Sequence, residues 1–102
     1  MIDEAVIREA GRRLAAAAPQ ARVVLFGSHA RGEATANSDL DFLVVEAEED
    51  DGSEAVRLMR VLRDLRVAAD VIVVSERYAE EWREVRGSLV HAALSEGRVL
   101  IG

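Results

Sequence analysis

The sequence contains no cysteine, a single proline and few aromatic residues (4%). Without cysteine, the chain can form neither a disulfide framework nor a zinc or iron–sulfur site with thiolate ligands. It also lacks an apolar run of the roughly 18–20 residues that a membrane-spanning helix needs. The first residues, Met1 to Glu4, lack the basic and apolar stretches of a secretory signal. These absences favour a protein that is not bound to a membrane and works in the cytoplasm.

Lysine is also missing, and the charge balance argues against one class of partner. The 102 residues include 19 acidic residues and 13 basic residues, all of them arginine, so the formal net charge is −6. Proteins that bind nucleic acids through their phosphates usually present a basic patch. We therefore expect no direct binding to DNA.

The hydrophobic patterns predict one α/β domain that spans residues 1–102. Apolar residues at helical spacing indicate helices, and short β-branched runs indicate strands. Because helices and strands alternate, we expect helices packed on a small mixed β-sheet. The predicted helices are 3–18, 28–31, 53–65, 75–82 and 89–96, with Ser53, Ser75 and Ser88 as caps, and the predicted strands are 22–26, 40–45, 69–74 and 98–101, the last at an edge.

The apolar stripe of the predicted helix 53–65 includes Leu58, Met59 and Leu62. Tyr78 and Trp82 stand four residues apart on the next predicted helix, a spacing that places them on one face. We favour a core role for these two aromatic residues over stacking on a nucleotide. Anchoring of a partner protein is the alternative, because aromatic residues are enriched at the centres of interfaces.

Three aspartates are candidate metal ligands. Asp39 and Asp41 alternate with Leu40 and therefore share one face of the predicted strand 40–45. Asp70 lies in the predicted strand 69–74. If the two strands are neighbours, three carboxylates converge, and their mutual repulsion favours a bound cation. The alternative is that Asp39 and Asp41 belong to the solvated face of an edge strand.

Carboxylates together with phosphate and water oxygens are the ligands that Mg²⁺ prefers. The corresponding chemistry is phosphoryl transfer with two metal ions, in which one ion activates a hydroxyl and the other binds the triphosphate. Asp39, Asp41 and Asp70 are accordingly the candidate catalytic residues, and Asp70 could also accept the hydroxyl proton.

A candidate phosphate site precedes these carboxylates. Gly27 ends the predicted strand 22–26 and, without a Cβ, allows a ligand to approach the backbone. Ser28 opens a short helix, and free backbone N–H groups at such an end can bind phosphate. Taken alone, the pair is more typical of an ordinary strand end and helix cap.

Three neighbouring side chains have open roles. Arg31 and Ser38 are candidates for binding the phosphate, although we favour structural roles for both. In that interpretation Arg31 braces the loop by pairing with a carboxylate, and Ser38 shapes the turn before Asp39. We expect His29 to face the solvent.

The segment GSHARGEATANSDLDFLV, residues 27–44, carries a family resemblance. Its pattern resembles the signature of the DNA polymerase beta-like nucleotidyltransferase superfamily, and in particular its minimal nucleotidyltransferase branch. The pattern consists of Gly27-Ser28, ten further residues, and then Asp39-Leu40-Asp41. The leading helix, Asp70 and the closing segment 87–100 also fit, so the resemblance covers nearly the whole chain.

The resemblance implies a polymerase beta-like fold, two Mg²⁺ ions, and a nucleoside triphosphate, ATP above all, as the donor substrate. The enzymes of that branch transfer AMP to a tyrosine of a partner, a helical HEPN-domain toxin, and so act as antitoxins. The expected partner of this chain is therefore a HEPN-domain toxin protein.

Two other functions stay open at this point. The protein could be an antitoxin that acts by binding and occlusion alone, or it could transfer the nucleotide to a small molecule. Since 102 residues leave no room for a second domain that holds the acceptor, we expect another chain, or a second copy in a homo-oligomer, to supply it.

Overall fold

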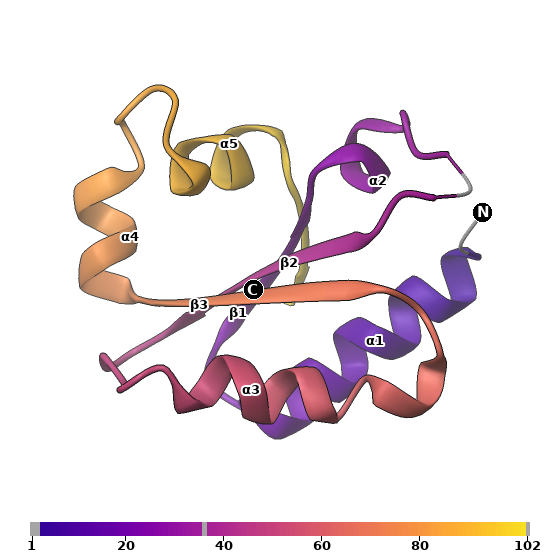
Figure 1. Ribbon diagram of the computed structural model, residues 1–102. Coiled ribbons are helices and arrows are strands. Elements are labelled where there is room, and N and C mark those ends of the chain that lie inside the picture. Colours follow the sequence, from indigo (N-terminus) through magenta and orange to yellow (C-terminus); the bar gives the residue numbers. More distant parts are fainter. Residues whose placement is uncertain (1–2, 36, 102) are drawn as a thin grey trace.

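The computed structural model describes residues 3–35 and 37–101, and its elements follow the predicted order (Figure 1). The predicted helix 53–65 divides into a helix and a 3₁₀ turn, and the other ends lie within a residue or two of the prediction. In chain order the elements are α1 (Glu4–Ala17), β1 (Arg22–Phe26), α2 (Ser28–Arg31), β2 (Leu40–Glu46), α3 (Ser53–Arg60), η1 (Arg63–Leu65), β3 (Ala69–Ser75), α4 (Glu76–Trp82), α5 (Leu89–Glu96) and β4 (Arg98–Ile101).

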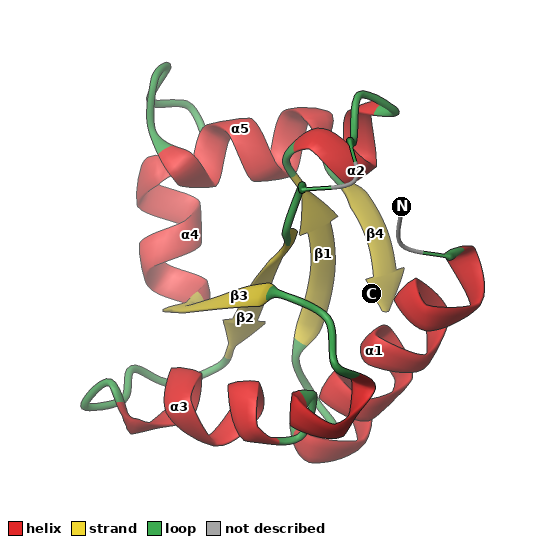
Figure 2. Cartoon of the chain, turned by 45° about the vertical axis from the view of Figure 1, so that its right-hand side comes forward, coloured by secondary structure: helices red, strands yellow, loops and turns green. Residues whose placement is uncertain are grey.

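The strands form a small mixed sheet in the order β3-β2-β1-β4, which confirms the predicted fold class (Figure 2). Strand β1 is antiparallel to both of its neighbours, β2 and β4. Strands β2 and β3 are parallel, and α3 lies in the connection between them. The two strands at the centre of the sheet are therefore β1 and β2, whereas β3 and β4 form its edges.

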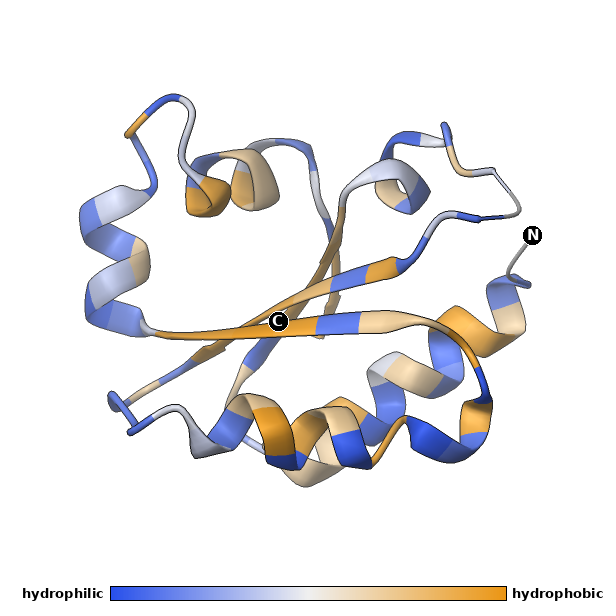
Figure 3. Ribbon diagram, in the orientation of Figure 1, coloured by the Kyte–Doolittle hydropathy of each residue, from blue (hydrophilic) through white to orange (hydrophobic). Residues whose placement is uncertain are grey.

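Helices cover both faces of the sheet. Helices α1 and α3 lie on one side, and α4 and α5 lie on the other (Figure 1). Because side chains alternate along a strand, β2 contributes Phe42 to the first cluster and Leu43 to the second, and both are fully buried. This two-sided burial explains why the strands read as almost continuous apolar runs (Figure 3). Each helix in the described part of the chain is too short or too polar to cross a lipid bilayer.

The start of α3 differs from the prediction. Ser53 is the first residue of the helix rather than its cap, and the capping position is taken by Gly52. Asp50 Oδ1 accepts hydrogen bonds from the backbone N–H groups of Gly52 (2.7 Å) and Glu54 (3.2 Å). Asp51 Oδ1 accepts one from Ser53 (3.1 Å). The two aspartates satisfy the first N–H groups, so the serine hydroxyl is not needed as a cap.

The apolar face of α3 is also narrower than predicted. Leu58 and Leu62 are buried, but Met59 is 42% exposed. The α-helix ends at Arg60 and gives way to the 3₁₀ turn, and Val61 and Leu65 rather than Met59 pack beside Leu58 and Leu62. The predicted burial of Met59 is therefore wrong.

The other two predicted caps are confirmed. Ser75 Oγ accepts a hydrogen bond from the N–H of Tyr78 at 3.0 Å, at the start of α4. Ser88 Oγ accepts one from the N–H of His91 at 3.1 Å, at the start of α5. Each cap fixes the direction in which its helix leaves the preceding segment.

Gly97 allows the turn after α5 to pack closely against β1. A Cβ on this residue would lie 2.6 Å from Val24 Cγ1 and 2.9 Å from the carbonyl oxygen of Leu25. Its φ of −76° suits any residue, so space alone requires glycine here. We expect Gly97→Ala to lower the free energy of unfolding by about 1–3 kcal/mol through overpacking, measured by urea denaturation.

The matched control is Gly87, which has a φ of +86° but open space around it. Asparagine tolerates that backbone conformation, so Gly87→Asn should cost much less than Gly97→Ala. Equal losses for the two variants would contradict the packing argument.

Candidate functional site

Two of the candidate aspartates lie side by side on the sheet. The parallel pairing places Asp41 of β2 opposite Asp70 of β3, and the antiparallel pairing places Phe26 of β1 opposite Asp41. Neighbouring strands are about 4.8 Å apart, so the two carboxylates are adjacent. They share the face of Leu43, which α4 and α5 cover further along the strands. Strands β2 and β3 are therefore neighbours, which is the condition for Asp41 and Asp70 to lie together.

Electrostatics connect the third aspartate to this pair. Asp39 is exposed in the segment just before β2. Partial burial raises the pKa of Asp41 above its usual range, and the negative charges of Asp70 and Asp39 raise it further. His29 and Arg31 oppose this shift with smaller effects. The site is thus a region of negative potential in which the ionised form of Asp41 is disfavoured.

In the described part of the chain, no arginine or histidine lies within ion-pairing distance of Asp39, Asp41 or Asp70. Over the same residues, no three or more His, Asp or Glu side chains are grouped closely enough to form a ready-made metal site. The candidate site thus consists of two adjacent carboxylates, Asp41 and Asp70, and of Asp39 in the segment just before β2.

Gly27 is required by its contact with Asp41. Its φ is +77°, and a Cβ there would collide with Oδ2 of Asp41 and lie 3.3 Å from its Cγ. The backbone of the loop that leads into α2 therefore passes directly against the carboxylate. Ser28 is the first residue of α2, so the candidate phosphate residues and the candidate metal ligands are neighbours in space.

His29 differs from the prediction that it faces solvent. The ring is part-buried, and its Nε2 lies 3.2 Å from the carbonyl oxygen of Ser38. This contact connects α2 to the residue that precedes Asp39. The sequence contains no local signal for it, because it depends on how the intervening loop returns to the helix.

Arg31 and Ser38 make the structural contacts that we favoured from the sequence. Arg31 Nε donates to Glu33 Oε1 at 2.8 Å, and its Nη1 lies 3.8 Å from Glu96 Oε2, so the side chain connects α2 to α5. Ser38 Oγ accepts a hydrogen bond from the N–H of Thr35 at 2.9 Å. Binding of a nucleotide by either side chain stays a prediction.

Comparison with known protein families identifies the chain. A family model that describes the nucleotidyltransferase domain matches residues 7–99. The chain belongs to this nucleotidyltransferase family. It is therefore a nucleotidyltransferase enzyme, and its mixed four-stranded sheet with helices on both faces agrees with the polymerase beta-like nucleotidyltransferase fold.

A solved structure is similar to this nucleotidyltransferase over most of its length. It is a chain in the crystal structure of a toxin-antitoxin with AMP-PNP, with 25% sequence identity and a TM-score of 0.63. The match covers 93% of this chain and 73% of that chain. Comparison with curated proteins finds no match.

Tyr78 and Trp82 of the nucleotidyltransferase are not core residues, which corrects the role that we favoured from their spacing. The two rings stack on each other with centroids 5.6 Å apart, and they are 42% and 39% exposed. Ala79, which lies between them in the sequence, is the buried residue of α4. Spacing by four residues identified a shared helix face but not which face.

The charge at Asp41 should oppose folding. Because burial and two carboxylates raise its pKa, the destabilisation is present above the raised pKa and disappears as the pH falls below the usual value of 3.8. We therefore expect Asp41→Asn to unfold at pH 7 at a temperature at least as high as the parent. Below about pH 3 the difference should vanish, as measured by thermal denaturation.

Leu43→Asn is the matched control on the same strand and face, because Leu43 is fully buried. An unpaired amide there costs about 1–3 kcal/mol in addition to the lost packing. A lower unfolding temperature for Asp41→Asn at pH 7 would contradict the electrostatic argument.

Proposed function

We propose that this nucleotidyltransferase transfers AMP from ATP to a hydroxyl of a partner protein in the cytoplasm, in an Mg²⁺-dependent reaction. The partner is a HEPN-domain toxin, and the protein is its antitoxin. The observation that carries the proposal is the side-by-side placement of Asp41 and Asp70 against the Gly27 loop in a member of this family. Similarity to a chain in a toxin-antitoxin structure with AMP-PNP supports the nucleotide and the partner.

The residues present fit Mg²⁺ by their chemistry. Carboxylate oxygens are the ligands that Mg²⁺ prefers, and the ionised form of Asp41 is disfavoured until a cation offsets its neighbours. Asp39, Asp41 and Asp70 would hold two ions. When bound, Mg²⁺ neutralises charge on the phosphates and lowers the pKa of an attacking hydroxyl.

The chain's own groups then position the reactants. Ser28 and the backbone at the start of α2 hold the phosphates, and Gly27 keeps the loop against Asp41. The acceptor oxygen forms a bond to the α-phosphorus while the bond from that phosphorus to the oxygen bridging to the β-phosphate breaks. Pyrophosphate leaves, and Asp70, which is exposed at the start of β3, accepts the hydroxyl proton.

Transfer of label tests the proposal. The protein is incubated with α-labelled ATP, Mg²⁺ and the HEPN-domain protein, and label on the partner is measured. Asp39→Asn or Asp41→Asn should reduce the rate about 10³-fold or more, because metal stabilisation of the transition state contributes several kcal/mol.

Asp64→Asn is the control, because Asp64 is exposed and pairs with Arg13 on the opposite side of the sheet from the candidate site. Its rate should stay within about twofold of the parent, as for most exposed positions. Absence of transfer with every nucleoside triphosphate would contradict the proposed activity. Protection of cells by the Asp39, Asp41 and Asp70 triple variant would favour occlusion instead.

Magnesium binding can be measured without a partner. A ligand present at ten times its dissociation constant stabilises the folded state by about 1.4 kcal/mol. For a domain of this size we expect Mg²⁺ to raise the unfolding temperature by about 5 °C or more. Asp41→Asn should abolish most of this rise, with NaCl of matched ionic strength as the control, and an equal rise in the variant would exclude Asp41 as a ligand.

A further inference from the structure

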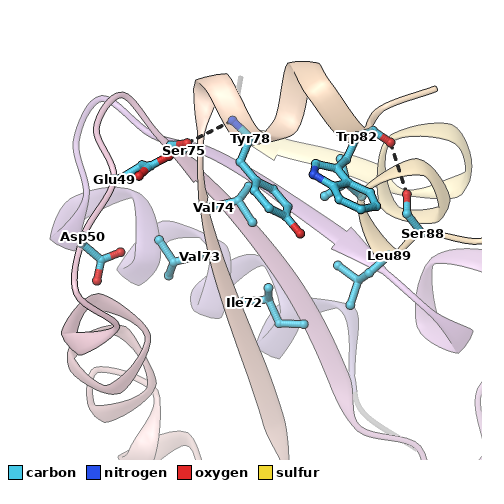
Figure 4. Close-up of a pocket in the computed structure, with 11 residues that line it drawn as sticks. Glu49, Asp50, Ile72, Val73, Val74, Ser75, Tyr78, Trp82, Ser88 and Leu89 are labelled. Atoms are coloured by element: carbon cyan, nitrogen blue, oxygen red, sulfur yellow. Dashed lines mark hydrogen bonds between the residues drawn. The ribbon is translucent and has the colours of Figure 1, made fainter. Parts of the chain in front are cut away.

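A groove of about 650 Å³ lies on the same face of the sheet as the candidate active site. Figure 4 shows the side chains that line it. It runs between the edge strand β3 on one side and helices α4 and α5 on the other. Ile72 and Val74 of β3, Tyr78 and Trp82 of α4, and Leu89 of α5 line it. None of these residues has a role in the transfer mechanism above.

Along β3, the groove lies next to the Asp41–Asp70 pair. Ile72 lies two residues after Asp70 on the same face of β3, which is about 7 Å along the strand. Val74 follows at the same spacing. The groove therefore begins where the Asp41–Asp70 pair ends, and a molecule bound in it would approach the reacting hydroxyl from one fixed side.

Three of the eight large hydrophobic side chains that are exposed in the described part of the chain line this groove. Tyr78, Trp82 and Leu89 are each about 40% exposed, although they are large and apolar. Tyr78 and Trp82 hold each other in place by stacking, with an angle of 19° between their planes. A rigid aromatic pair of this kind loses little conformational entropy when a partner covers it, which is why such residues dominate binding at interfaces.

The charge of the groove selects its occupant. Glu49 and Asp50 line one end, both are exposed, and among the described residues no arginine lines the groove. Two carboxylates repel a triphosphate but attract a lysine or arginine side chain. Stacking also occupies one face of each ring, so Tyr78 and Trp82 cannot hold a nucleotide base between them.

We propose that this groove binds a segment of the acceptor protein and so delivers its hydroxyl to Asp70. An apolar side chain of the segment packs against Tyr78, Trp82 and Leu89. A lysine or arginine of the same segment pairs with Glu49 and Asp50. Val74 lies about 13 Å along β3 from Asp70, so an extended segment places the apolar anchor about four residues from the hydroxyl. This inference rests on the proposed function, because it assumes a protein acceptor.

The direct test is an NMR titration of ¹⁵N-labelled protein. Trp82 is the single tryptophan of the chain, so its indole N–H reports on the groove without ambiguity. The probes are short peptides that carry a tyrosine, a leucine four residues later and an arginine beyond it. AMP-PNP with Mg²⁺ is added in a separate titration.

We expect the peptide to shift the Trp82 indole signal and AMP-PNP with Mg²⁺ to shift the amide signals of Gly27 and Ser28. Replacing the peptide leucine by alanine, or its arginine by glutamate, should weaken binding at least about tenfold, which is about 1.4 kcal/mol. A response of Trp82 to AMP-PNP would overturn the proposal in favour of a nucleotide site. Absence of a response to every peptide would also overturn it.

Surface variants extend the test to the HEPN-domain protein in the transfer assay. Glu49→Arg should raise the KM for this acceptor at least about tenfold and leave the KM for ATP unchanged, whereas Glu48→Arg, which makes the same charge change outside the groove, should have little effect. Leu89→Ser and Met59→Ser form a second matched pair, because both side chains are about 40% exposed and only Leu89 lines the groove. Equal effects within either pair would overturn the proposal.

Failure of the proposed function gives a different pattern. If Gly27 and Ser28 do not respond to AMP-PNP with Mg²⁺ while Trp82 responds to the peptide, the nucleotide site is wrong and the groove is a binding surface of another kind. If AMP-PNP binds and label transfer proceeds equally in all groove variants, the enzyme is correct and the groove assignment is wrong.

Discussion

The parallel pairing of β2 with β3 is the constraint on which the rest of the site depends. It places Asp41 opposite Asp70, and the same register continues from Leu43 opposite Ile72 to Val45 opposite Val74. A slip of one residue would turn the side chains of one strand to the other face. One carboxylate would then lie among the apolar side chains under α1 and α3. Hydrophobic packing thus fixes the register that holds two like charges together.

The magnitudes explain why this arrangement folds. Two carboxylates at neighbouring positions repel each other by about 1–4 kcal/mol, depending on how much water surrounds them. Strand β2 alone has five essentially fully buried apolar side chains: Leu40, Phe42, Leu43, Val44 and Val45. Each contributes about 1.5–3 kcal/mol by leaving water, so burial outweighs the repulsion. A region of unfavourable charge can therefore persist at one end of a well-packed strand.

Local sequence patterns predicted the helices and strands better than they predicted which residues lie next to one another in space. The alternation around Asp41 gave its strand and its face, because these depend only on adjacent residues. Whether Asp70 lies opposite Asp41 depends on the path of the chain through α3. The residue pattern of either strand carries no information about that path. His29 is similar, because its contact with Ser38 forms only after the loop has closed.

Helix faces were predicted less well than helices. The spacing of Tyr78 and Trp82 fits a buried stripe as well as an exposed one, and the burial of Ala79 decides between them. The start of α3 is a related case, because Asp50 and Asp51 compete with the serine for the same N–H groups. Such choices depend on competing contacts whose energies differ by about 1 kcal/mol or less.

The position of β4 has a consequence for synthesis of the chain. Val99 of β4 pairs with Val24 of β1, although 75 positions separate them. The chain through Ser75 contains β1, β2 and β3, but β1 keeps an unpaired edge until residues 98–101 have been made. At about 5–20 residues per second, this interval lasts about 1–5 s on the ribosome. An open strand edge invites pairing with other chains, so the nascent protein passes through a short period in which its central sheet is most prone to aggregate.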